Sequence, residues 1–315
     1  MFQTGFVTDS RLKQHVTGSD HPEHPDRIGA ILNRLEWSGL ARDLIAISPQ
    51  IATEEQLVRV HPASYIELVT REAAEGFHHL STGDTHINDK TPEVARRAAG
   101  CAVAAVDAVF SREVHNAFCA IRPPGHHASQ SRGMGFCVFN NVAIAARHAQ
   151  SVYGAEHIAI VDWDVHHGNG TQDIFYEDGA VLFFSTHQSP WYPGTGAVDE
   201  TGEGDGAGKI INCPLPAGSG REKVMNAFTG KLLPALDAFG PDLILLSAGF
   251  DSRAGDPLGH FMLRDSDFRD LTVLMIDAAE KYCDGRLVSL LEGGYNLEGL
   301  ALATEAHVRA LAGDF

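Results

Sequence analysis

Six short runs of nearly continuous apolar residues occur along the chain, and they do not alternate between apolar and polar positions. Strands buried on both faces, as in a parallel sheet, have this pattern, whereas strands with one face in water alternate. The pattern therefore predicts strands of a buried, mainly parallel sheet. These strands are expected at 116–121, 157–165, 180–187, 209–215, 242–251 and 286–295.

Longer segments with helical periodicity lie between these runs, so strands and helices alternate along the chain. This alternation is typical of α/β proteins with helices on both faces of a central sheet, which makes three layers. No Pro-, Gly- or Ser-rich linker separates the periodic segments, so we expect one domain over residues 1–315. The predicted helices are 93–110, 141–152, 222–238, 264–281 and 297–311.

Three Gly- and Pro-rich stretches follow or flank predicted strands, at 122–135, 188–208 and 251–260. In open parallel sheets, ligands bind beyond the carboxyl ends of the strands. We therefore expect these loops to form the rim of a pocket.

Composition narrows the range of functions. The chain has 315 residues, with 24 Lys and Arg against 41 Asp and Glu, which makes the formal net charge −17. A surface of this charge disfavours nucleic acid and attracts cationic substrates.

The five cysteines form no CxxC pair, so neither a disulfide framework nor a Cys-rich zinc site is expected. No secretory leader or membrane span is apparent, which predicts a soluble, cytoplasmic protein. The oligomeric state stays open.

Histidine is abundant, at 17 residues, and several histidines fall with other ionisable residues at the ends of predicted strands. The carboxyl ends of parallel strands meet at one sheet edge, so these side chains are expected to converge. The residues concerned are His126, His127, Asp162, Asp164, His166, His167, Asp251 and Tyr295.

Asp164 and His166 are two residues apart at a strand end, which places both side chains on one face. Asp251 can converge on them from another strand. Two carboxylates and one imidazole suit a divalent metal, with Zn²⁺ first, and leave positions for water and substrate. The alternative is that this segment merely holds a capping Asp and surface histidines.

The tandem pair His126-His127 lies on a Gly-Pro loop and can supply a general base. The carboxylate of Asp162 can orient one of the two imidazoles. Tyr295, in the sequence EGGY, can donate a hydrogen bond to an oxyanion. The structural alternatives are histidines without a catalytic role and a tyrosine that caps the core.

Together, these motifs resemble the zinc-dependent histone deacetylase family, which has an arginase-like α/β fold. The form is that of class II enzymes and their bacterial relatives, including acetylpolyamine amidohydrolases. The resemblance runs in order from about residue 15 to 300. It rests on HPEHPDR (21–27), RPPGHHA (122–128), GFCVFNN (135–141), VDWDVHHGNGTQDIFY (161–176), STH (185–187) with YPGTG (192–196), SAGFDS (247–252) and LEGGYN (291–296).

The resemblance implies a role for each matching residue. Asp164, His166 and Asp251 would bind one catalytic Zn²⁺. His127 would be the principal general base, with His126 beside it and held by Asp162. Tyr295 would polarise the acetamide carbonyl.

The resemblance also implies a substrate tunnel, an exit channel and structural cation sites. Gly135, Phe136 and Tyr192 would line the tunnel, with Leu258 at its gatekeeper position, and Arg27 would lie near a channel for acetate release. A structural K⁺ or Na⁺ ion would be held by Asp162, Asp164, His166, Ser185 and Thr186. A second such site would use backbone near Phe175, Asp178 and Val181.

The expected activity is metal-dependent removal of acetyl or other acyl groups from lysine side chains of proteins or peptides. Asn169 replaces the second Asp of class I enzymes, so His127 should be less basic, and retention of Tyr295 indicates a competent deacetylase. The neutral Leu258 favours acyl-lysine. Acetylpolyamine is the alternative substrate, because Glu23 and the acidic stretch 199–205 can recognise a second ammonium group.

Two other classes of protein remain as alternatives. A two-metal ureohydrolase on the same fold needs additional carboxylates to bridge two Mn²⁺ ions, and the segment DWDVHHGNG lacks the second Asp for that role. A non-catalytic acyl-lysine-binding protein would keep the pocket, but complete retention of the catalytic set argues against it. The sequence has neither the basic stripe nor a known motif of sequence-specific nucleic-acid-binding proteins, which argues against that function.

Overall fold

A computed structural model describes residues 3–314 and shows one eight-stranded sheet in the order β2-β1-β3-β8-β7-β4-β5-β6. All seven strand pairings are parallel. The predicted buried parallel sheet is therefore confirmed. The strands are β1 (Thr4–Val7), β2 (Ile45–Ala46), β3 (Asn116–Cys119), β4 (Ile158–Asp162), β5 (Val181–Gln188), β6 (Ile210–Leu215), β7 (Leu243–Ala248) and β8 (Leu287–Leu291).

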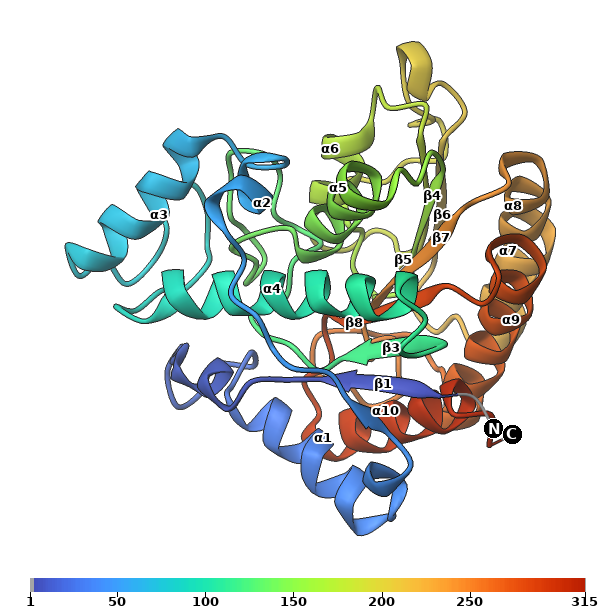
Figure 1. Cartoon of the computed structure of the whole chain (residues 1–315), viewed down its shortest axis with the longest axis horizontal. Coiled ribbons are helices and arrows are strands. Elements are labelled where there is room, and N and C mark those ends of the chain that lie inside the picture. The colour runs from blue at the N-terminus through green and yellow to red at the C-terminus, as the bar shows by residue number, and fades with distance from the viewer. Residues whose placement is uncertain (1–2, 315) are drawn as a thin grey trace.

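Helices cover both faces of the sheet, as expected for three layers (Figure 1). In β4, Ile158 and Ile160 belong to one apolar core with α4 and α5, whereas Ala159 and Val161 belong to a second core with α1, α9 and α10. Successive strand residues thus face opposite helix layers, and for that reason the strands read as continuous apolar runs. The helices are α1 (Asp26–Trp37), α2 (Glu54–Val58), α3 (Ala63–Ala74), α4 (Thr91–Phe110), α5 (Asn141–Tyr153), α6 (Asn169–Phe175), α7 (Arg221–Ala227), α8 (Leu233–Phe239), α9 (Asp265–Cys283) and α10 (Leu297–Leu311).

The structure refines several predicted boundaries. Strand β4 ends at Asp162, β7 at Ala248 and β8 at Leu291, so the polar ends of the predicted runs are loops. The predicted helix 222–238 is interrupted by a π-helical turn, η4 (Phe228–Leu232). Pro234 has no N–H to bond to the carbonyl four residues earlier, which is consistent with a widened turn just before it.

The first 90 residues contain elements that the apolar pattern did not predict. Strand β1 has the sequence TGFV, with only two large apolar residues, and β2 has only two residues, so neither forms a continuous apolar run. They extend the sheet beyond β3. Within residues 3–314, no helix combines the length and apolar character needed to cross a membrane.

Candidate active site

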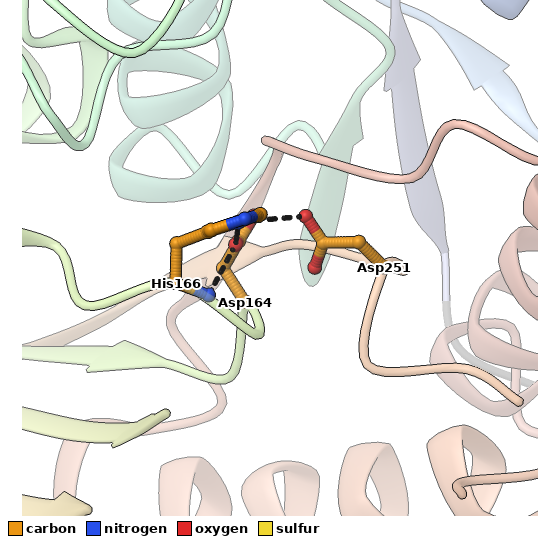
Figure 2. A group of neighbouring side chains, drawn as sticks. All are labelled: Asp164, His166 and Asp251. Atoms are coloured by element: carbon orange, nitrogen blue, oxygen red, sulfur yellow. Dashed lines mark hydrogen bonds and ion pairs between the residues drawn. The ribbon is translucent and has the colours of Figure 1, made fainter. Parts of the chain in front are cut away.

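The candidate residues meet beyond the carboxyl ends of four strands that are consecutive in the sheet, β3, β8, β7 and β4. The loop after β3 carries His126 and His127, and the loop after β8 carries Tyr295. The loop after β7 carries Asp251, and the loop after β4 carries Asp164 and His166. Figure 2 shows these last three side chains pointing toward one another from two separate loops.

Asp164, His166 and Asp251 form a buried group whose potential ligand atoms all lie within 4.8 Å of one another. His166 Nδ1 lies 2.9 Å from Asp164 Oδ1 and 3.3 Å from Asp251 Oδ2. Asp251 Oδ2 is buried and has no hydrogen-bond partner among the described residues. Burial, and then the neighbouring Asp164, raise the pKa of the Asp251 carboxyl. Two carboxylates and one imidazole, with a buried carboxylate oxygen that accepts no hydrogen bond within residues 3–314, fit a divalent cation such as Zn²⁺.

Backbone groups and glycines hold this cluster together. The N–H of Gly293 donates to Asp164 Oδ2 at 2.8 Å, and that of Val165 donates to Asp251 Oδ1 at 2.9 Å. A Cβ atom on Gly293 would lie 1.9 Å from Asp251 Oδ2, and one on Gly249 would lie 2.1 Å from Asp164 Oδ2. Only glycine at these two positions lets the backbone approach the carboxylates so closely.

The two tandem histidines have different partners. His126 Nδ1 lies 2.9 Å from Asp162 Oδ2, and His127 Nδ1 lies 2.8 Å from Asn169 Oδ1. Burial alone would lower the pKa of His126, but Asp162 and Asp164 outweigh it and raise that pKa to about 10. Burial, together with His126 and His166, holds the pKa of His127 well below its usual value. Asp162 thus favours the protonated form of His126, whereas the surroundings of His127 favour its neutral form, and its Nδ1 donates to the amide oxygen of Asn169.

Glu292 holds the loop that carries these histidines. Its Oε2 accepts hydrogen bonds from the backbone N–H of Gly125 at 2.6 Å and of His126 at 3.1 Å. The side chain is fully buried, and burial raises its pKa to about 7. Sequence analysis assigned no role to Glu292, although it directly follows β8 in the segment LEGGYN, and this strand-end position was the available signal.

A cavity of about 240 Å³ leads to His127, His166 and Tyr295. All four residues predicted to form the tunnel line it, and they are Gly135, Phe136, Tyr192 and Leu258. The Tyr192 ring meets the His127 ring edge-on at 5.2 Å, and Phe136 meets Tyr295 edge-on at 5.8 Å. The walls are therefore mainly aromatic and aliphatic.

Two further lining residues, Asp84 and Trp191, were not predicted. The exposed Asp84 accepts hydrogen bonds from Gly135 N at 2.7 Å and from the Tyr192 hydroxyl at 3.2 Å. Trp191 Nε1 donates to the Leu258 carbonyl at 2.8 Å. Asp84 follows no predicted strand, so strand-end position offered no signal for it. Trp191 directly precedes Tyr192, which was predicted to line the tunnel, and this position in the sequence could have identified it as a lining residue.

Arg27 lies buried behind Tyr295. Its guanidinium carbon is 5.0 Å from the centre of the Tyr295 ring, and its Nε donates to the Gly294 carbonyl at 2.7 Å. Arg27 also pairs with Glu23 at 3.3 Å. The arginine thus packs against the loop that carries the tyrosine, on the inner side of the site.

The expectation that Glu23 recognises a polyamine is wrong. Glu23 is fully buried and pairs with Arg122 at 2.6 Å as well as with Arg27. The acidic stretch 199–205 does not contribute to the lining of the described cavity either. Its Glu200 is engaged by Gln172, whose side-chain amide donates to it at 2.6 Å.

The residues expected to hold a monovalent cation lie close together. Asp162 and Ser185 are register partners on β4 and β5, and Thr186 follows directly. Asp162 Oδ1 accepts the backbone N–H of Asp164 at 3.0 Å. At the second expected site, near Phe175 and Val181, the Asp178 carboxylate is paired with Arg147 at 2.6 Å, so any ion there would rely on backbone oxygens.

Comparisons with known proteins agree with this arrangement. The family model described as histone deacetylase domain matches residues 21–311. A probable deacetylase of Archaeoglobus fulgidus is 40% identical over 98% of this chain and 86% of its own length. A histone deacetylase-like amidohydrolase of Pseudomonas aeruginosa is 40% identical over 95% of this chain and 79% of its own length.

Two further relatives extend the comparison. The polyamine deacetylase HDAC10 of Mus musculus is 42% identical over 93% of this chain, which spans 45% of that protein. The crystal structure of the HDA15 HD domain matches with a TM-score of 0.94 and 37% identity, over 100% of this chain and 90% of that one. The chain therefore belongs to the histone deacetylase family and is a hydrolase of the deacetylase and amidohydrolase type.

Proposed function

We propose that residues 1–315 form one catalytic domain that uses a single Zn²⁺ ion to remove acetyl groups from lysine side chains of proteins or peptides. The observation that carries this proposal is the position of the Asp164, His166 and Asp251 group. It lies at the end of an apolar tunnel whose inner wall also presents His127 and Tyr295. Metal ligands, a neutral imidazole and a phenol around one cavity are the groups that hydrolysis of an amide requires.

Asp164, His166 and Asp251 would hold the ion, which when bound supplies Lewis-acid polarisation of the amide carbonyl and of the attacking water. His127 Nε2 takes the proton from the attacking water. The Tyr295 hydroxyl donates a hydrogen bond to the carbonyl oxygen as negative charge develops on it. His127 then delivers the proton to the leaving amine, while the Asp162 carboxylate holds and orients the neighbouring His126.

The tunnel supports acyl-lysine as the substrate class. Its walls include Phe136, Tyr192 and Leu258, which match a chain of methylenes, and the Leu258 side chain carries no charge for a second ammonium group. The alternative substrate, an acetylpolyamine, is supported by the exposed carboxylate of Asp84 in the cavity lining and by the resemblance to a polyamine deacetylase.

Three accessory proposals accompany this function. The position of Arg27 against Tyr295 and Gly294 supports a route for acetate on the inner side of the site. The grouping of Asp162, Asp164, His166, Ser185 and Thr186 supports a structural K⁺ or Na⁺ ion. The five buried, unpaired cysteines support a reducing compartment such as the cytoplasm.

The arrangement supports this proposal over its alternatives. The candidate metal group found among residues 3–314 contains two carboxylates and one histidine, which suits one ion better than a bridged pair. The side chain next to His127 is the amide of Asn169 and not a carboxylate. A protein that only binds acyl-lysine would not need both the His127 imidazole and the Tyr295 phenol in one cavity.

The substrate class is tested by measuring kcat/KM for acetyl-lysine peptides, acetylputrescine and acetylspermidine with the Zn²⁺-loaded protein. The proposal expects the peptides to be hydrolysed at least as efficiently as the polyamines. A large preference for the polyamines would contradict the lysine assignment and leave the deacetylase assignment intact.

A further inference from the structure

One buried carboxylate joins the tunnel loop to the loop that carries the catalytic tyrosine. Asp256 is 8% exposed. Its Oδ1 accepts the backbone N–H of Leu258 at 2.9 Å. Its Oδ2 accepts the backbone N–H of Tyr295 at 2.7 Å and that of Asn296 at 3.1 Å. The two loops follow different strands, β7 and β8, and meet at this side chain.

The loop of Tyr295 needs such an anchor because two glycines precede the tyrosine. Gly294 has φ of +118°, a conformation that glycine adopts easily and leaves easily. Arg27 holds the carbonyl of Gly294 on one side. Asp256 holds the N–H of the next residue, so the peptide bond before Tyr295 is fixed at both its oxygen and its nitrogen.

The other oxygen of Asp256 acts on the tunnel wall. The N–H of Leu258 is bound by Asp256, and the carbonyl of Leu258 accepts a hydrogen bond from Trp191 at 2.8 Å. Leu258 and Tyr295 both line the same cavity. A change in one Asp256 contact therefore displaces either the wall that contacts the substrate chain or the phenol that contacts its carbonyl.

We propose that Asp256 is a positioning residue for deacetylation, which sets the place of the Tyr295 hydroxyl and couples it to Leu258 in the tunnel wall. This inference rests on the proposed function of Tyr295. It assigns to Asp256 no contact with substrate or metal. Its effect on catalysis arises from geometry, because a displacement of about 1 Å at a reacting group can cost on the order of 100-fold in rate.

The test compares Asp256→Asn with Asp256→Glu. The Asn side chain has the same shape but only one acceptor oxygen, so its NH₂ group would face a backbone N–H and one set of contacts is lost. We expect Asp256→Asn to lower kcat at least tenfold with a smaller change in KM. Asp256→Glu keeps two acceptor oxygens and should recover part of the loss. Asp267→Asn is the matched control, because Asp267 is 6% exposed and accepts the backbone N–H of Arg264 at 2.8 Å, away from the cavity lining.

Combination with Tyr295→Phe separates positioning from general destabilisation. If Asp256 acts through the Tyr295 hydroxyl, Asp256→Asn should lower kcat much less in the Tyr295→Phe background than in the wild type. An equal loss in both backgrounds, or full activity of Asp256→Asn at unchanged KM, would overturn the proposal.

A readout independent of activity keeps the inference separate from the proposed function. The chain has six tyrosines, so fluorotyrosine labelling gives few ¹⁹F signals, and loss of one signal in Tyr295→Phe assigns that residue. The Tyr295 signal should shift or broaden in Asp256→Asn and not in Asp267→Asn. An unchanged signal would refute the positioning role, whereas an inactive wild type with a shifted signal would refute only the deacetylase assignment.

Discussion

The Nδ1 atom of His127 lies 2.8 Å from Oδ1 of Asn169, so the general-base candidate donates its hydrogen bond to a neutral amide. Its neighbour His126 is instead paired with the carboxylate of Asp162 at 2.9 Å. The centres of the two imidazole rings lie 4.0 Å apart. The pKa of His126 is shifted upward and that of His127 downward. Different partners thus favour opposite protonation states in two adjacent imidazoles.

Asn169→Asp tests this division. A carboxylate beside His127 favours the protonated imidazole and raises the pKa of His127. Because the neutral form acts as the base, the acid limb of kcat/KM against pH should move to higher pH in the Zn²⁺-loaded variant. The variant should therefore lose activity first at low pH. An acid limb that stays in place or moves downward would contradict the assignment of His127.

Tyr295→Phe removes the hydroxyl that we propose as the donor to the substrate's carbonyl oxygen, and it leaves the ring in place. Loss of one oxyanion donor costs about 10²–10³ in kcat. The variant should still bind one metal ion with wild-type affinity, because Tyr295 is not among the candidate ligands. Metal content by elemental analysis and kcat on an acetyl-lysine peptide check this. Wild-type turnover would exclude the oxyanion role.

Gly293→Ala probes the packing around the metal group. Its Cβ would lie 1.9 Å from Asp251 Oδ2 and 2.6 Å from Asp164 Oδ2, so the two carboxylates must move apart. We expect Zn²⁺ affinity to fall by at least tenfold in competition with a chelating dye. Gly230→Ala is the control, because its Cβ would meet no atom within 4 Å and its φ is not positive. Equal affinities in the two variants would contradict the geometry of the site.

Glu23 is predicted to stabilise the fold and not to select the substrate. Burial alone would raise its pKa, but Arg122, together with Arg27, lowers it to about 2 from an ordinary value of 4.5. Because the pKa of Glu23 is lower in the folded chain than in the unfolded chain, the ionised carboxylate stabilises the fold at any pH above about 4.5. This stabilisation is lost as the pH falls from about 4.5 toward 2.

Glu23→Gln leaves two buried arginines without a counter-charge and should cost about 3–5 kcal/mol in the free energy of unfolding near neutral pH. Urea denaturation measures this loss, and the difference from wild type should shrink at acid pH. If Glu23→Gln keeps the stability of the wild type and loses activity on acetylpolyamines only, Glu23 selects the substrate and does not stabilise the fold.

The central sheet was predictable because its strands are buried on both faces and therefore read as continuous apolar runs. The convergence of the candidate metal ligands and of the histidine pair was predictable because all of them lie in loops that follow those strands. Other contacts depend on distant segments. Asp84 binds Gly135 51 residues later, and Glu292 binds Gly125 across 167 residues, so the local pattern predicts neither contact, although the strand-end position of Glu292 marks it as a candidate.

Glu23 shows how a local pattern misleads. In its Pro- and His-rich segment it reads as an exposed acid, but the fold places it against Arg122, 99 residues later in the chain. Strands β1 and β2 escaped prediction for a different reason, since TGFV and the two residues of β2 do not form a continuous apolar run.

Titration of metal-free protein with Zn²⁺, with deacetylation of an acetyl-lysine peptide as the readout, tests the central claim most directly. The account predicts that activity rises linearly and reaches its plateau at one Zn²⁺ per chain. It also predicts that Asp164→Ala and Asp251→Ala abolish this rise. A plateau at two metal ions per chain, or full activity of the metal-free protein, would contradict a single-metal site built from Asp164, His166 and Asp251.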